Sequence, residues 1–150
     1  PPILRALAGS LRADYANYVE ITRLSRLSSG VSESAAAAMK KGESIRAVFQ
    51  QGHHALSSLA EMVLQLYAVQ HGYLDELDQD AKTAYCERIY AFTKEHDPGL
   101  IRSIEEKQKM TPDIEDGLAR IVKDYFGRIK REIAAMGDQN DTPTDSEQVE

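Results

Sequence analysis

Four acidic residues near the middle of the chain form its densest group of potentially reactive side chains. They fall within six positions, as Asp75, Glu76, Asp78 and Asp80. Paired carboxylates can act as acid and base, and clustered ones can bind Ca²⁺. The segment lacks the Asp-x-Asp-x-Asp-Gly spacing with a distal Glu that a calcium loop requires, and no polar pocket is indicated beside it. We interpret it as a solvated turn or, alternatively, as an acidic docking edge for a basic partner surface.

Histidine and cysteine side chains are the other candidate ligands and nucleophiles. His53 and His54 are adjacent, so on a helix they would point in different directions, and no third ligand lies at a suitable spacing. His71 precedes a glycine, and we expect it, like His96, in the last turn of a helix, where the helix dipole favours histidine. Cys86 has no obvious neighbouring base and no second thiol. We therefore predict a packing role for Cys86 and a polar connection for the two adjacent histidines.

Several classes of ligand are not indicated by the sequence. No glycine begins a GxxxxGK[ST] phosphate loop. The net charge of −6 comes largely from residues 137–150, which contain five acidic residues and no Lys or Arg. The remainder is close to neutral and carries no basic stripe for nucleic acid. No run approaches the ~20 apolar residues of a membrane span, and no secretory h-region is present. We predict no catalytic, cofactor or metal site, and a cytosolic or matrix-like location.

Helices are the elements that must position these side chains. Apolar residues recur at three- and four-residue steps, and cap and turn residues interrupt them. We predict an all-α bundle of about five to six helices over residues 1–136 and a disordered acidic tail over residues 137–150. The helices are expected at about 3–27, 32–51, 58–71, 80–95, a short stretch after Pro98, and 112–135, with Gly137 ending the last one.

Local signals also predict which helices pack closely. Ser58 and Glu61 have the spacing of a capping box, and the apolar band that follows makes this third helix the most buried one. Gly42 inside the second helix costs ~1 kcal/mol relative to alanine, which close packing or a local kink would offset. Large apolar residues and most of the seven tyrosines are expected in the core, among them Tyr15, Tyr18, Met39, Val48, Phe49, Ile129 and Ile133.

An ordered series of motifs resembles a known family. The stretch from Ala8 to Tyr18 is similar to the AGxLRxDxAxY segment that opens the C-terminal helical domain of F-type ATP synthase alpha subunits. Further similar segments follow in the family's order, and the resemblance spans about residues 6–126. These segments are Met39-Lys40-Lys41-Gly42, the stretch Val63 to Asp75 (VxxLYAxxxGYLD in the family), Phe92 to Pro98, and Asp124-Tyr125-Phe126.

The resemblance implies an assembly role without catalysis. In the full alpha subunit, ATP or ADP and Mg²⁺ bind in a separate central domain that this chain lacks. The helical domains of alpha and beta subunits form a collar around the central gamma stalk, on the cytoplasmic face of a membrane or in an organelle matrix. The acidic residues at 75–80 would then be a candidate contact with a basic stalk surface. The chain departs from the family pattern at Ala55, where a proline is common, and at Ser44, where an arginine is common.

Two functional classes remain open at this stage. The first is a piece of a rotary ATP synthase that couples to protons or sodium ions, and the start at Pro1-Pro2 leads us to expect a fragment of something longer. The second is a free-standing helical adaptor that binds partner helices in a groove between its own helices. A phosphate loop encoded upstream would favour the first class, whereas a start codon directly before Pro1 would favour the second.

Overall fold

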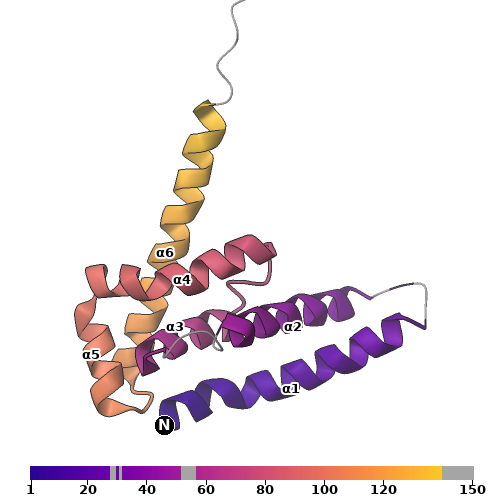
Figure 1. Cartoon of the computed structure of the whole chain (residues 1–150), viewed down its shortest axis with the longest axis horizontal. Helices are drawn as coiled ribbons and strands as arrows, with labels where there is room; N and C mark the ends of the chain where they lie inside the picture. The colour runs from indigo at the N-terminus through magenta and orange to yellow at the C-terminus, as the bar shows by residue number, and fades with distance from the viewer. Residues whose placement is uncertain (28–29, 31, 52–56, 140–150) are drawn as a thin grey trace, which may run out of the picture.

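The computed structural model describes residues 1–27, 30, 32–51 and 57–139, and all regular elements in these ranges are helices. Figure 1 shows α1 and α2 side by side, with α3, α4 and α5 packed at one end and α6 projecting away. Among the described helices, none is long and apolar enough to cross a membrane. The helices are α1 (Pro2–Ser25), α2 (Glu33–Gln51), α3 (Leu59–Gln70), α4 (Gln79–His96), α5 (Pro98–Lys107) and α6 (Pro112–Gln139).

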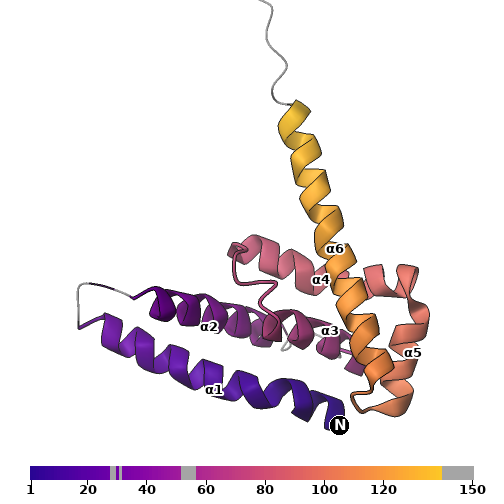
Figure 2. The ribbon, with the colours of Figure 1, turned by 180° about the vertical axis from the view of Figure 1, so that it is seen from behind.

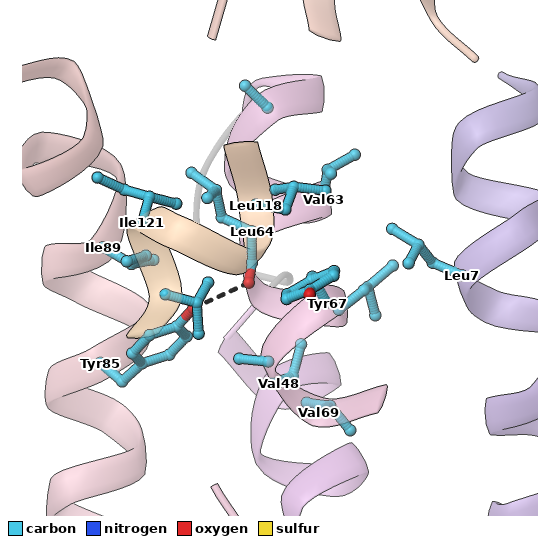
Figure 3. Packing of buried hydrophobic residues seen from close by; sticks show 14 of the residues in the cluster. Leu7, Val48, Val63, Leu64, Tyr67, Val69, Tyr85, Ile89, Leu118 and Ile121 are labelled. Atoms are coloured by element: carbon cyan, nitrogen blue, oxygen red, sulfur yellow. Dashed lines mark hydrogen bonds between the residues drawn. The ribbon is translucent and has the colours of Figure 1, made fainter. Parts of the chain in front are cut away.

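The short helix α3 lies at the centre of the bundle and contacts all five other helices. Every residue from Val63 to Val69 is buried, and so is Ala60. Figure 3 shows side chains of the other helices closing around it, including Leu7 of α1, Val48 of α2, Ile89 of α4 and Leu118 of α6. A helix buried on all sides carries apolar residues around its whole circumference, as this sequence does. The prediction that the third helix is the most buried one agrees with these exposures.

Two buried hydrogen bonds join α3 to α4. The Tyr85 hydroxyl donates to the Leu64 carbonyl at 2.9 Å, and the Gln65 amide nitrogen donates to the Cys86 carbonyl at 3.1 Å. The first of these bonds is the dashed line in Figure 3. Each satisfies a polar side chain that would be costly to bury without a partner. The tyrosine ring also stacks on Phe126, which extends the packed region to α6.

The close approach of α1 and α2 depends on Gly42. A Cβ atom added to Gly42 would overlap Cβ and Cγ of Tyr18, so this glycine lets the tyrosine lie directly against the α2 backbone. Of the two compensations expected for a glycine inside a helix, the structure therefore has close packing. The start of α1 is fixed separately, because the Ile3 N–H donates to the Gln108 carbonyl after α5 at 3.0 Å.

Side-chain caps begin four of the helices where the sequence predicted them. Ser32, Ser58, Asp97 and Thr111 each accept a backbone N–H from the first turn of α2, α3, α5 and α6, respectively. At α3 the Ser58 hydroxyl accepts from the Glu61 N–H, as the capping box requires. The carboxylate that reaches the same helix end belongs to Glu105 of α5, which accepts from the Ala60 N–H at 2.9 Å.

Several expectations about exposure and helix ends are wrong. Phe49, expected in the core, is 53% exposed, and Ile133 is 65% exposed. Gly137 does not end the last helix, which continues to Gln139 and so crosses the expected boundary between residues 136 and 137. Figure 2 shows the reason for Ile133: the second half of α6 extends beyond the helices that bury its first half. Residues 140–150 of the tail expected over residues 137–150, together with His53, His54 and Ala55, lie outside the described residues.

We expect Gly42→Ala to lower the free energy of unfolding by ~1–3 kcal/mol, the usual cost of overpacking. The overlapped atoms are at the root of the Tyr18 side chain, so a rotamer change cannot relieve the clash. Urea denaturation measures this difference. Gly9→Ala is the matched control, because an added Cβ at Gly9 of α1 meets nothing within 4 Å. It should stabilise the fold by up to ~1 kcal/mol through helix propensity. Equal effects of the two substitutions would contradict the packing role.

Candidate functional site

The segment from residue 72 to residue 80, here called the acidic turn, connects α3 to α4 and contains the four acidic candidates. It starts with a helix-ending motif in which Gly72 adopts a left-handed conformation with φ of 77°. The Tyr73 N–H donates to the Ala68 carbonyl and the Gly72 N–H to the Val69 carbonyl. These are the two bonds of a Schellman motif, which favours glycine at this position. The expectation that Gly72 caps the third helix is confirmed.

Lys41 of α2 holds the acidic turn against α2. Its ammonium donates to the Val69 carbonyl at 2.6 Å, at the C-terminal end of α3, and lies 3.5 Å from Asp75 Oδ2. Both side chains of this ion pair are 20% exposed. A cation at a helix C-terminus is favoured by the helix dipole, and the Val69 carbonyl accepts this bond in addition to the one from the Gly72 N–H. Lys41 therefore joins α2 to the end of α3 and to the acidic turn.

Ser44 completes this anchor with a second contact to the same carboxylate. It is fully buried, and its hydroxyl oxygen lies 3.0 Å from Asp75 Oδ1 and 3.1 Å from the Lys40 carbonyl. Each Asp75 oxygen thus has a partner on α2, which directs this carboxylate inward. Ser44 is one of the two positions at which the sequence departs from the family pattern, and here the smaller side chain fits a fully enclosed space.

Only part of the acidic turn faces solvent. Asp78 accepts the Ala81 N–H at 2.8 Å and caps α4, so its carboxylate is used within the fold. Glu76 is 80% exposed at its side chain and pairs with Lys40 at 3.0 Å. Asp80, in the first turn of α4, is exposed, with no ion pair or side-chain hydrogen bond to the described residues. Glu76, Asp78 and Asp80 are all exposed, and of these three only Asp78 caps a helix.

The remaining candidate residues, His71, His96 and Cys86, contact other parts of the fold. His71 is the C-terminal cap residue of α3, as expected, and its ring lies 4.1 Å from that of Tyr67. His96 is the last residue of α4, with its ring 4.4 Å from that of Phe92. Cys86 is buried, and this burial raises the pKa of its thiol to about 12. Across the described ranges, no group of three or more His, Cys, Asp or Glu residues could hold a metal ion.

The residues that anchor the acidic turn were not identified from the sequence. Lys41 lies in a segment noted only for its basic residue before glycine, and Ser44 was noted only as a departure from the family pattern. Their shared partner, Asp75, is more than 30 residues away in the chain. Periodicity within a helix carries no signal for such a contact.

Comparison with known proteins gives consistent matches. The model of the family described as "ATP synthase alpha/beta chain, C terminal domain" matches residues 1–125. A protein named ATP synthase subunit alpha from Janthinobacterium sp. (strain Marseille) is 27% identical over 123 residues, covering 82% of this chain and 24% of that protein. Proteins of the same name from Francisella tularensis subsp. holarctica (strain OSU18) and subsp. novicida (strain U112) are each 30% identical over 122 residues. These cover 81% of this chain and 24% of the relatives, so the chain spans about a quarter of their length.

We expect Asp75→Ala to lower the free energy of unfolding by ~1–3 kcal/mol, because it leaves buried Ser44 and Lys41 without their common acceptor. Glu76→Ala is the matched control on the adjacent residue. Its exposed ion pair contributes only ~0–1 kcal/mol. Urea denaturation of both variants gives the comparison. Equal losses of stability would contradict the anchoring role of Asp75.

We also expect Cys86 to resist alkylation by iodoacetamide at pH 8 while the protein is folded. With a pKa of about 12, the thiol is almost entirely protonated at this pH, and the thiolate is the reactive form. Mass spectrometry of samples labelled with and without urea measures the difference, with the unfolded protein as the control. Equal labelling rates would show that Cys86 is neither enclosed nor protonated.

Proposed function

We propose, from the premise that this protein belongs to the family of C-terminal domains of ATP synthase alpha and beta subunits, that it is the helical assembly domain of an alpha subunit. The family match through residue 125 carries this proposal. It ends at Tyr125, the last buried residue of α6 among those described, so the matched residues include most of the packed core. The names of these relatives support the alpha rather than the beta subunit. In this role the domain contributes packing surface, and the nucleotide chemistry belongs to other parts of the subunit.

The domain's partners in this proposal are beta subunits and the central gamma stalk. Together the helical domains would form a collar around the stalk, in the peripheral part of a proton- or sodium-coupled enzyme at the cytoplasmic face of a membrane or in an organelle matrix. ATP or ADP with Mg²⁺ would bind in the central domain of the same subunit. An ordered bundle whose central helix contacts every other helix supports this role, because a collar must transmit force without losing its shape.

Within this proposal, the acidic turn contacts the stalk through Glu76 and Asp80. Both carboxylates are exposed, and the turn that carries them is held to α2 by Lys41 and Ser44. A rigid acidic edge gives a basic partner a fixed set of charges to align with, which favours register and orientation more than affinity. Asp75 and Asp78 support the edge, because α2 holds the first carboxylate and the second caps α4.

A test of the proposal is the double substitution Glu76→Lys and Asp80→Lys in the alpha subunit of the assembled ATP synthase. Reversal would place like charges against a basic stalk at a cost of several kcal/mol, so we expect less ion pumping for each ATP hydrolysed, with assembly retained. Pumping and hydrolysis are measured together in inverted membrane vesicles.

Glu95→Lys with Glu106→Lys is the matched control, because both residues are exposed and lie outside the acidic turn. Unchanged pumping in the test variant would remove the stalk contact from the proposal. Failure of the unsubstituted subunit to co-purify with beta subunits would remove the assembly role itself.

A further inference from the structure

A groove of about 610 Å³ lies between α1 and α2 and has an apolar floor and walls. Leu11 and Ile45 are buried at its base. Tyr15, 39% exposed, and Phe49, 53% exposed, line it from opposite helices. The exposed apolar surface of α1 continues one turn beyond Tyr15 at Val19, which is 50% exposed. Exposed aromatic side chains beside a hollow are typical anchor points of protein interfaces.

The spacing of these residues fits a helix better than a compact ligand. Leu11 and Tyr15 are separated by four residues, as are Ile45 and Phe49, so each wall presents one apolar side chain per turn. Ala8 and Ala16 also line the groove on α1 and leave room for another backbone to approach. An amphipathic helix that lies along such a groove places its own apolar residues at the same spacing.

The charges at the groove have one sign. Arg12 and Arg46 line it, and none of the described residues that line it carries a carboxylate. Both side chains are exposed, and neither forms an ion pair with any residue that the structure describes. Arg46 also borders a second cavity that contains Glu43 and Asp78, but neither carboxylate lies within 4.0 Å of its guanidinium. Two guanidinium groups that lack an ion-pair partner in the described part of the chain, beside an apolar groove, favour carboxylates on its occupant.

We propose that the α1–α2 groove binds an amphipathic helix of a partner protein, with apolar side chains against Leu11, Tyr15 and Phe49 and flanking carboxylates paired with Arg12 and Arg46. This interaction is separate from the stalk contact of Glu76 and Asp80 and does not depend on it.

Two other occupants fit the groove less well. A second copy of this protein in a symmetric dimer would bring the same patch against itself, and the arginines of both copies would face each other without lining carboxylates. Residues 140–150 carry acidic side chains, but Val149 is their single large apolar residue. That segment could pair with the arginines while leaving Phe49 and Tyr15 uncovered.

Binding of synthetic amphipathic helical peptides to the full-length protein, residues 1–150, tests the proposal. One peptide carries leucines along one face with flanking glutamates, and a matched peptide carries lysines in place of the glutamates. Fluorescence anisotropy gives the dissociation constants at low and high salt. We expect the glutamate peptide to bind at least ~10-fold more tightly than the lysine peptide, with a difference that shrinks as salt screens the charges.

Substitutions in α1 and α2 locate the binding. Arg12→Glu and Phe49→Ala should each weaken binding of the glutamate peptide by ~10-fold or more, and Arg12→Glu should strengthen binding of the lysine peptide. Arg5→Glu and Leu24→Ala are the controls, because both residues are exposed on α1 and do not line the groove. Circular dichroism checks that the variants fold. If Phe49→Ala does not fold, Arg12→Glu still decides the outcome through its opposite effects on the two peptides.

Three results would overturn the proposal. Equal binding of the two peptides would identify a non-selective apolar patch. A concentration-dependent dimer that Phe49→Ala abolishes would identify a second copy as the occupant. A variant truncated after Gln139 that binds the glutamate peptide ~10-fold more tightly than residues 1–150 would show that residues 140–150 occupy the groove.

Discussion

Burial of α3 on all sides is the constraint on which the rest of the fold depends. A helix buried over most of its length needs partners for the N–H and C=O groups at its two ends, and here other helices supply some of them in addition to the local caps. Glu105 of α5 serves the N-terminal end, and Lys41 of α2 serves the C-terminal end. The polar side chain within the helix, Gln65, reaches the Cys86 carbonyl of α4. Enclosing this one helix thus determines where three others lie.

The same constraint shapes the acidic turn. Because Lys41 must approach the end of α3, it also reaches Asp75, and Ser44 one turn further along α2 holds the other oxygen of that carboxylate. Asp78 has a separate duty as the cap of α4. A run of acidic residues that looks uniform in sequence therefore contains one carboxylate held by α2, one that caps α4, and two that do neither. Glu76 and Asp80 gain a fixed position from Asp75 and Asp78.

Surfaces rather than reactive groups carry the function that we propose for this protein. The one cysteine is enclosed and protonated, and the buried tyrosine of α4 donates to a backbone carbonyl. Large apolar side chains remain exposed at the α1–α2 groove, around the C-terminal end of α1, where Leu24 and Leu27 are 49% and 80% exposed, and along the projecting half of α6, where Ile133 and Met136 are 65% and 67% exposed. Such side chains are costly in an isolated domain, but they are expected where other proteins pack.

The helices follow from the sequence alone, because their signals are local: apolar periodicity, capping side chains at the starts of four helices, and a glycine in a left-handed turn after α3. The ordered motifs of the sequence also indicated the family. The exposure of apolar side chains and the pairing of acidic ones depend on the tertiary structure. Phe49 and Ile133 have the periodicity of core residues, but burial requires a neighbouring helix, and periodicity does not show where that neighbour ends. The four acidic residues were equally ambiguous, since the partners that separate Asp75 from Glu76 come from α2, more than 30 residues away.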